Sequence, residues 1–164
     1  MKQLKSLHIG LITGLIMIIA SVLSFYVFQL PAASKSQLLI YSIYSVGVIG
    51  SLILFHNSGV ADKKFKDYFS EGFKTFIIVV LLMAVYTFIF FKMNPQILND
   101  FIAENNKLLA AEGNRTPAEI ATNANNIRSG FLITMVMYAI ITYLIIGALI
   151  SVIGAGFLSQ KKDA

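Results

Sequence analysis

Four long apolar stretches constrain this chain more than any other feature of its sequence. They cover about residues 7–30, 37–57, 72–93 and 130–158, and each has at least the roughly 20 residues that a helix needs to cross a bilayer. Charged residues make up only 13% of the chain, whereas a soluble domain has roughly a quarter. The sequence therefore predicts an all-α integral-membrane bundle of four transmembrane helices, folded as a single membrane domain over residues 1–164.

The first apolar stretch resembles a signal peptide in its position only. The apolar region of a signal peptide has about 7 to 15 residues, and the stretch that ends before Pro31 is longer. The segment Pro31–Ser34 does contain small residues of the kind found at cleavage sites. We interpret the stretch as a retained transmembrane helix because of its length.

The distribution of Lys and Arg predicts the orientation in the membrane, since cytoplasmic flanks retain positive charge. The N-terminus, the loop before the third span and the C-terminus together hold eight of the 13 basic residues. The other side holds five. We therefore expect both termini to face the cytoplasm. The net charge of +5 then indicates contact with membrane lipid rather than nucleic acid.

The segment between the second and third spans predicts an amphipathic interfacial helix over about residues 62–72. At 100° per residue its aromatic and basic side chains separate onto opposite faces. Such a helix lies in the cytoplasmic interface, with lysines at lipid phosphates and rings in the acyl boundary. It is either a simple anchor or a contact for lipid or a partner. The residues concerned are Lys63, Lys64, Phe65, Lys66, Tyr68 and Phe69.

A polar stretch of about residues 94–129 separates the third and fourth spans. Pro95 is suited to a first helical turn. Apolar residues recur at helical spacing after it, and Gly113 is expected to end that helix. Thr116, Pro117 and Glu119 have the spacing of a capping box with proline at the first helical position. We therefore expect an extracytoplasmic helical hairpin over the outer mouth of the bundle, acting as a cover, a lid or a docking surface.

Small residues at four-residue spacing predict close helix contacts within the membrane. They are Gly10, Gly14, Gly47, Ser51, Gly147, Ser151 and Ala155. Tyrosine hydroxyls near the bilayer centre need partners or water, so Tyr86, Thr142 and Tyr143 are expected to point inward. Such an intramembrane polar cluster either holds helices together or lines a narrow polar path.

The chemical inventory of the chain is small. It has no cysteine and two histidines, His8 and His56, to which we assign structural roles because each lacks neighbouring metal ligands. No nucleophile–base pair, carboxylate pair or phosphate-binding loop is recognisable. We expect no catalytic residue, no cofactor and no metal.

The order of these features resembles a known family. The pattern is four spans, the stretch Phe65–Lys74 leading into the third, and a long polar segment before the fourth. It is similar to small integral-membrane proteins of Bacteroidota grouped as domain of unknown function 4199. The resemblance implies a protein of the bacterial cytoplasmic (inner) membrane with no assigned biochemical activity, and it assigns no site residue.

Two functions remain open from the sequence. The first is a non-enzymatic accessory, interaction or structural module that associates with a membrane-protein partner, with itself or with lipid. The alternative is a small transporter or channel acting as a homo-oligomer. Ion-coupled transporters usually carry a charged residue inside the membrane, and Glu71, Lys74 and Lys92 are expected at span ends, so proton coupling is disfavoured.

Overall fold

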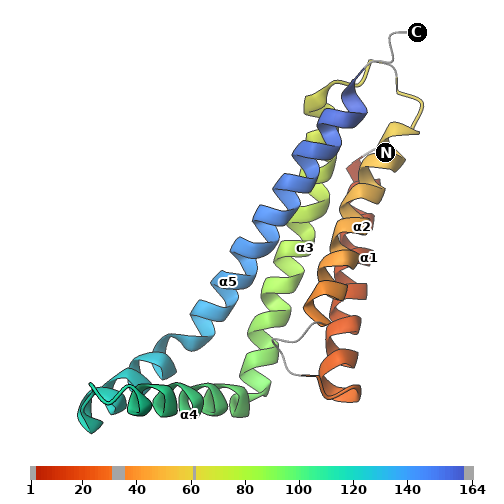
Figure 1. The fold of residues 1–164 in the computed structure, drawn as a ribbon. Coiled ribbons are helices and arrows are strands. Elements are labelled where there is room, and N and C mark those ends of the chain that lie inside the picture. The colour runs from red at the N-terminus through yellow and green to blue at the C-terminus, as the bar shows by residue number, and fades with distance from the viewer. Residues whose placement is uncertain (1–2, 31–35, 61, 161–164) are drawn as a thin grey trace. The chain divides into compact units, whose positions relative to one another are not determined.

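A computed structural model of the chain describes residues 3–30, 36–60 and 62–160. Within these ranges every regular element is helical (Figure 1). The α-helices are α1 (Gln3–Val22), α2 (Ser36–His56), α3 (Phe65–Met93), α4 (Pro95–Ala111) and α5 (Pro117–Ser159). A single π-helical segment, η1 (Leu23–Val27), continues directly from α1.

Four helical segments are long and apolar enough to cross a membrane, namely Ser6–Val27, Gln37–His56, Phe65–Met93 and Pro117–Ser159. The prediction of an all-helical chain with four such helices is therefore confirmed. Helix α5 has 43 residues, which at 1.5 Å per residue is about 65 Å. A hydrocarbon core of about 30 Å accommodates only part of that length.

The first span ends earlier than the sequence predicts. Its last π-helical residue is Val27 rather than Leu30, and Gln29 has a positive φ of 51°. The helical conformation is disfavoured for the residue that precedes a proline, so the helix ends before Pro31. The predicted small-residue segment Pro31–Ser34 lies outside the described residues.

The structure differs from the predicted interfacial helix over residues 62–72. Helix α3 begins at Phe65 and continues unbroken to Met93, so no turn separates an interfacial segment from the third span. The predicted faces also change, because Tyr68 and Glu71 are both buried. The aromatic and basic residues from Phe65 onward therefore belong to the first turns of α3 itself.

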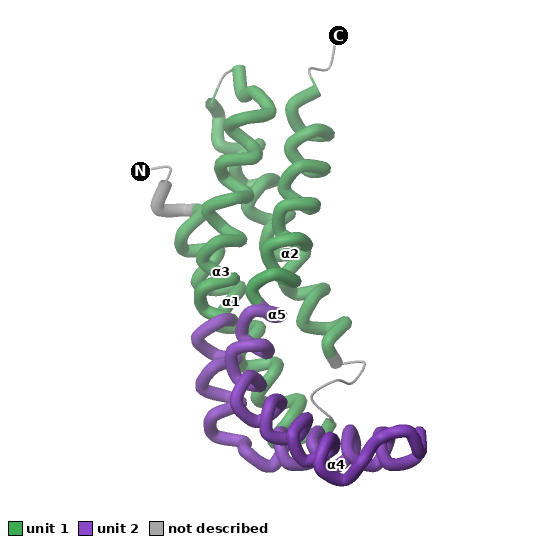
Figure 2. The backbone as a smooth tube through the Cα atoms, turned by 90° about the vertical axis from the view of Figure 1, so that its left-hand side faces the viewer, with its two compact units in different colours: residues 1–83, 140–164 green, residues 84–139 purple. Residues whose placement is uncertain are grey.

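The chain divides into two compact units, residues 1–83 with 140–164 and residues 84–139 (Figure 2). Unit 1 contains α1, η1, α2, the first part of α3 and the last part of α5. Its fully buried side chains come from all four helices and include Met17, Tyr44, Val79 and Ser151. Large apolar side chains such as Ile12, Val46 and Phe157 lie exposed on its surface, as expected for helices that face lipid.

Unit 2 contains the end of α3, helix α4 and the first part of α5. Helix α4 and the first part of α5 lie side by side and antiparallel in both views (Figures 1 and 2). Phe131 is buried, with ring centroids 5.4 Å from Phe91 and 5.7 Å from Phe101. The predicted capping box is present, since the Thr116 N–H donates to Glu119 over 2.8 Å and the Glu119 N–H donates to Thr116 Oγ1 over 3.3 Å.

Candidate functional site

A polar cluster occupies the end of unit 1 where α2 ends and α3 begins. The chain enters α3 through a cap in which Asp67 Oδ2 accepts a hydrogen bond from the Lys64 N–H over 2.9 Å. One turn later, Glu71 is 8% exposed and is the most buried charged residue described. A buried carboxylate needs partners that compensate for lost water, so its neighbours define the site.

The partners of Glu71 come from two helices. Ser6 of α1 donates its hydroxyl to Glu71 Oε2, and Lys74 Nζ donates to Glu71 Oε1 over 3.0 Å. Next to them, Thr75 Oγ1 donates to the Ser6 carbonyl over 3.3 Å. The carboxylate therefore ties α1 to α3. Glu71 lies near the start of α3, as expected for a residue at a span end, but its side chain is turned inward and buried.

A second set of contacts joins α2 to the start of α3. His56 Nδ1 and the Tyr68 hydroxyl are 2.7 Å apart, and their rings stack with centroids 5.9 Å apart. Lys63 Nζ donates to the His56 carbonyl and lies 5.1 Å from the centroid of the Phe55 ring. His56 thus acts at a helix junction. His8, the other histidine, is exposed on α1.

These side chains surround a cleft of about 280 Å³. Its charged lining is Lys63, Asp67, Glu71 and Lys74, and its apolar lining is Phe55 and Val60. Ser70 completes it. Of the predicted lipid or partner contacts, only Lys63 lines this cleft. Lys64, Lys66 and Phe65 are exposed, Phe69 is half-buried and Tyr68 is buried.

The predicted packing residues lie at helix contacts inside unit 1. A Cβ added at Gly10 would meet the Thr75 carbonyl at 2.8 Å, and one at Gly14 would meet Leu82 at 2.5 Å. A Cβ at Gly47 would overlap the Thr13 side chain, and one at Gly147 would overlap Tyr44 and Phe76. These glycines mark where two helices approach most closely.

The other small residues lie along the same interior. Ser151 is fully buried and contacts Gly72, where an added Cβ would lie 2.5 Å from Ser151 Oγ. Ser51 is buried and donates to the Val48 carbonyl over 2.7 Å. Ala155 is fully buried in a cluster with Leu52 and Tyr68.

The predicted intramembrane polar cluster is divided between the two units. Tyr143 is buried in unit 1, where its carbonyl accepts a hydrogen bond of 2.8 Å from the Tyr44 hydroxyl. Thr142 is half-buried beside it in the chain. Tyr86 belongs to unit 2, where its ring lies 5.6 Å from that of Phe90. The aromatic partners of Tyr143 are Tyr41 and Tyr44, at 5.8 and 5.5 Å.

Sequence reasoning did not identify Tyr44 or Glu71 as interior residues. Tyr44 is fully buried, yet helix α2 is apolar around its whole circumference, so periodicity does not indicate its inward face. Glu71 lies among charged residues in the sequence. The spacing Ser6 to Gly10 on α1 and Glu71 to Thr75 on α3 becomes informative only once the two helices are known to be adjacent.

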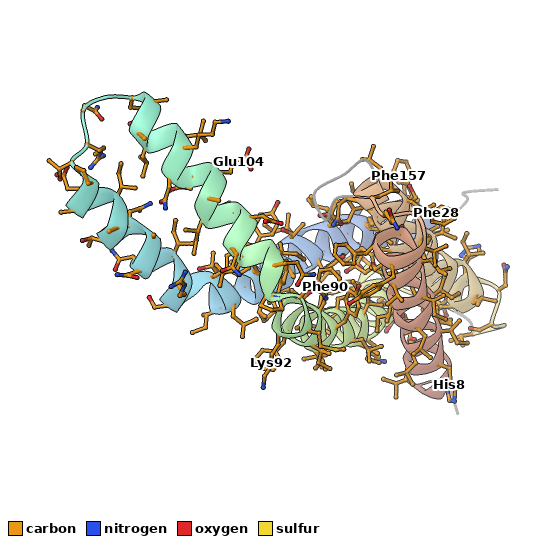
Figure 3. All side chains as sticks on the ribbon, turned by 90° about the horizontal axis from the view of Figure 1, so that it is seen from below. His8, Phe28, Phe90, Lys92, Glu104 and Phe157 are labelled. Carbon is orange, nitrogen blue, oxygen red and sulfur yellow. The ribbon has the colours of Figure 1, made fainter. Side chains whose placement is uncertain are left out.

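The surface of unit 2 carries a second feature, the α4 outer face, which we define as Phe101 and Leu108. They lie seven residues apart, close to two helical turns, and are 45% and 61% exposed. Ile102 on the neighbouring side of the helix is buried. Figure 3 shows Glu104 pointing away from the first part of α5, so α4 presents apolar and charged side chains together on its exposed side.

Among the described residues, no group of three or more His, Asp or Glu side chains is arranged to hold a metal ion. Near the end of α3, Lys92 Nζ lies 5.7 Å from the Phe88 ring centroid, and its side chain points away from the helices (Figure 3).

The helices and their lipid-compatible surfaces define a multi-pass membrane protein. Residues 8–160 match the family model described as protein of unknown function (DUF4199). The match covers nearly the whole chain, so the protein belongs to this family, and the resemblance seen in the sequence is confirmed. No curated protein and no solved structure matches the chain.

Proposed function

We propose that this protein is a non-enzymatic accessory module that associates with another membrane protein through the α4 outer face. The observation that carries the proposal is the exposure of Phe101 and Leu108 on a helix that is not among the membrane-crossing segments. Exposed large apolar side chains on a polar helix are typical of interaction sites.

The charge of α4 favours a protein partner over lipid. Between Pro95 and Ala111 the helix carries Asp100, Glu104 and Lys107, so its acidic side chains outnumber the basic one. Anionic lipid attracts basic helices, and an acidic helix is repelled. A partner protein with a matching apolar surface and basic residues suits this face better.

The proposed topology follows from the basic residues. We place the protein in a bacterial cytoplasmic membrane with both termini in the cytoplasm and α4 on the opposite side. The bias of eight basic residues against five supports this orientation. A single cysteine introduced at Gln160 and another at Glu112, labelled in intact cells by a membrane-impermeant maleimide, test it. Only the second position is expected to react.

The test of the function is crosslinking in the native membrane, gentle purification and mass spectrometry of what is recovered. A foreign protein in fixed stoichiometry is expected, and Leu108→Glu is expected to abolish its recovery. Ala110→Glu is the matched control, because it introduces the same charge at another exposed position of α4. Equal recovery with both variants contradicts the proposed interface.

A transporter or channel acting as a homo-oligomer is the alternative. The interior of unit 1 supports the accessory module instead, because its buried hydroxyls close helix contacts at Gly47, Gly72 and Gly147. A polar path needs room for water beside such groups. Recovery of the protein only with copies of itself, together with substrate flux in proteoliposomes that Tyr143→Phe abolishes, would establish the alternative.

A further inference from the structure

The cleft at the junction of α2 and α3 combines features of a ligand site. It is lined by two ammonium groups, on Lys63 and Lys74, and by two carboxylates, on Asp67 and Glu71, of which Lys74 and Glu71 form an ion pair of 3.0 Å. Their formal charges cancel. A lining that is neutral overall but carries both signs matches a zwitterion better than a simple anion or cation.

The charged groups of the cleft retain hydrogen-bonding capacity. An ammonium has three donors, and the contacts described for Lys63 and Lys74 use one each, to the His56 carbonyl and to Glu71. A carboxylate has about four acceptor sites, and Asp67 Oδ2 receives the Lys64 N–H. Phosphate oxygens therefore suit the lysines, and an ammonium suits the carboxylates.

Rigidity distinguishes this cleft from a chance arrangement of surface charges. Glu71 is 8% exposed and is held by Ser6 and Lys74. Lys63 is positioned against the Phe55 ring. Binding to groups that are already ordered costs less conformational entropy than ordering free surface side chains.

The location of the cleft favours a lipid over a free metabolite. It lies where α2 ends at His56 and α3 begins at Phe65, which is the end of two segments able to cross the membrane. Ile53 and Leu54, just before the apolar lining residue Phe55, are 47% and 58% exposed. Acyl chains can follow these side chains along α2 while the headgroup enters the cleft.

We infer that this cleft binds the headgroup of a zwitterionic phospholipid in which a phosphate and a primary ammonium lie close together, as in phosphoethanolamine. Lys63 and Lys74 hold the phosphate, Asp67 and Glu71 hold the ammonium, and Phe55 with Val60 contacts the glycerol region. The inference does not depend on the proposed partner of α4, since all six side chains belong to unit 1.

The experiment uses the full chain, purified in detergent and depleted of lipid. Its thermal unfolding and native mass spectrum are recorded with phosphatidylethanolamine, phosphatidylglycerol or phosphatidylcholine of the same acyl chains. Phosphatidylethanolamine is expected to give one retained lipid and the largest rise in Tm. Phosphatidylcholine keeps the charges but has no N–H donor, so its effect should be smaller. Soluble phosphoethanolamine, tested alone, shows whether the headgroup suffices or the acyl chains are needed.

Variants separate recognition from stability. Lys63→Ala is expected to weaken phosphatidylethanolamine binding about tenfold or more, as for loss of a hydrogen bond to a charged group. Lys66→Ala is the control, because Lys66 is an exposed lysine of the same segment that does not line the cleft. Asp67→Asn keeps an oxygen that can cap α3 but removes a negative charge, so it should shift the preference toward phosphatidylglycerol.

The shift in preference cannot result from a merely weakened fold, which would lower Tm equally with every lipid. Equal effects of the three lipids on the unaltered protein, with no response to soluble phosphoethanolamine, would overturn the inference. Unchanged phosphatidylethanolamine binding by Lys63→Ala would also overturn it. Failure to recover a partner in the crosslinking experiment does not affect these lipid-binding measurements, so either proposal can fail without the other.

Discussion

The two units of this protein differ in how closely their helices approach at glycines. In unit 1, glycines lie at helix contacts, as at Gly47 against Thr13 and Gly147 against Tyr44, and ring pairs such as Tyr44 with Tyr143 add to them. In unit 2, the contact is made by large rings, with Phe131 between Phe91 and Phe101, and by a 2.7 Å hydrogen bond from Asn123 to Asn105. The comparison separates packing by close backbone approach from packing by bulky side chains.

The physical reason lies in the solvent of each helix surface. Lipid tails are as apolar as leucine, so burying an apolar side chain between membrane helices gains little, and close approach through small residues stabilises them instead. Helix α4 is not among the segments able to cross a membrane, and it carries Asp100, Glu104 and Lys107. On a polar helix of this kind, burying an apolar side chain such as Ile102 removes apolar surface from water.

The largest expected effect is on the glycine contacts of unit 1. Gly147→Leu would place a side chain where Tyr44 and Phe76 already lie, and we expect a loss of about 3 kcal/mol or more from overpacking. Gly156→Leu, on the same helix, has nothing within 4 Å of an added Cβ and should be near neutral. Thermal unfolding of both variants in detergent measures the difference. If both variants were destabilised equally, the close helix contact at Gly147 would not be the cause of the effect.

The ring cluster of unit 2 should respond to truncation rather than enlargement. Phe131→Ala removes the ring that Phe91 and Phe101 share, and a buried Phe→Ala change costs about 3 kcal/mol. We expect faster hydrogen exchange in α4, measured by mass spectrometry, and little change in α2. Phe157→Ala, at a highly exposed ring, is the control. If hydrogen exchange in α4 were unchanged in Phe131→Ala, the ring cluster would not contribute to the stability of α4.

The polar end of unit 1 should show an intermediate effect. Glu71→Ala removes the acceptor of the Ser6 hydroxyl and of Lys74, and we expect a loss of about 2 kcal/mol, typical of hydrogen bonds to a charged group. Glu71→Gln keeps an acceptor and should restore part of that stability. Melting temperatures of the two variants test this order, and a Glu71→Ala protein as stable as the original would contradict it.

The smallest expected effect concerns the start of α5. Thr116→Ala removes the side-chain half of the capping box that Thr116 forms with Glu119, a change worth about 1 kcal/mol. Hydrogen exchange should increase in the first turns of α5 and remain unchanged in its last part. Thr122→Ala, whose hydroxyl donates only to the Ala118 carbonyl, is the matched control. An effect that spread into unit 1 would indicate stronger coupling along α5 than a cap provides.

Prediction from sequence succeeded where local chemistry decides the structure. The four apolar lengths, the start of α4 at Pro95 and the start of α5 at Pro117 all follow from composition, proline and capping. It failed at Glu71 and Tyr68, because the polar and aromatic faces of residues 62–72 suggested a helix lying on the membrane. Only the packing of α1 and α2 against α3 shows that these two side chains point inward.

The candidate cleft was less predictable than the helices. Lys63 was recognised as a charged contact residue, whereas Asp67 was not singled out and Glu71 was expected only at a span end. The cleft brings together residues from the end of α2, the connection and α3. These charged residues meet only because the chain reverses direction between α2 and α3. The periodicity within one segment does not predict that contact.

The sequence by itself determined that the chain is helical, that four of its segments can cross a membrane, and where proline and capping residues begin α4 and α5. Hydropathy and capping act over a few neighbouring residues, so they can be recognised locally. The tertiary structure alone decided which face of each apolar helix points inward, that Tyr44 hydrogen-bonds the Tyr143 carbonyl, and that Glu71 is buried beside Ser6. The sequence of a helix that is apolar around its whole circumference does not indicate which side contacts other helices. Those contacts are determined by packing.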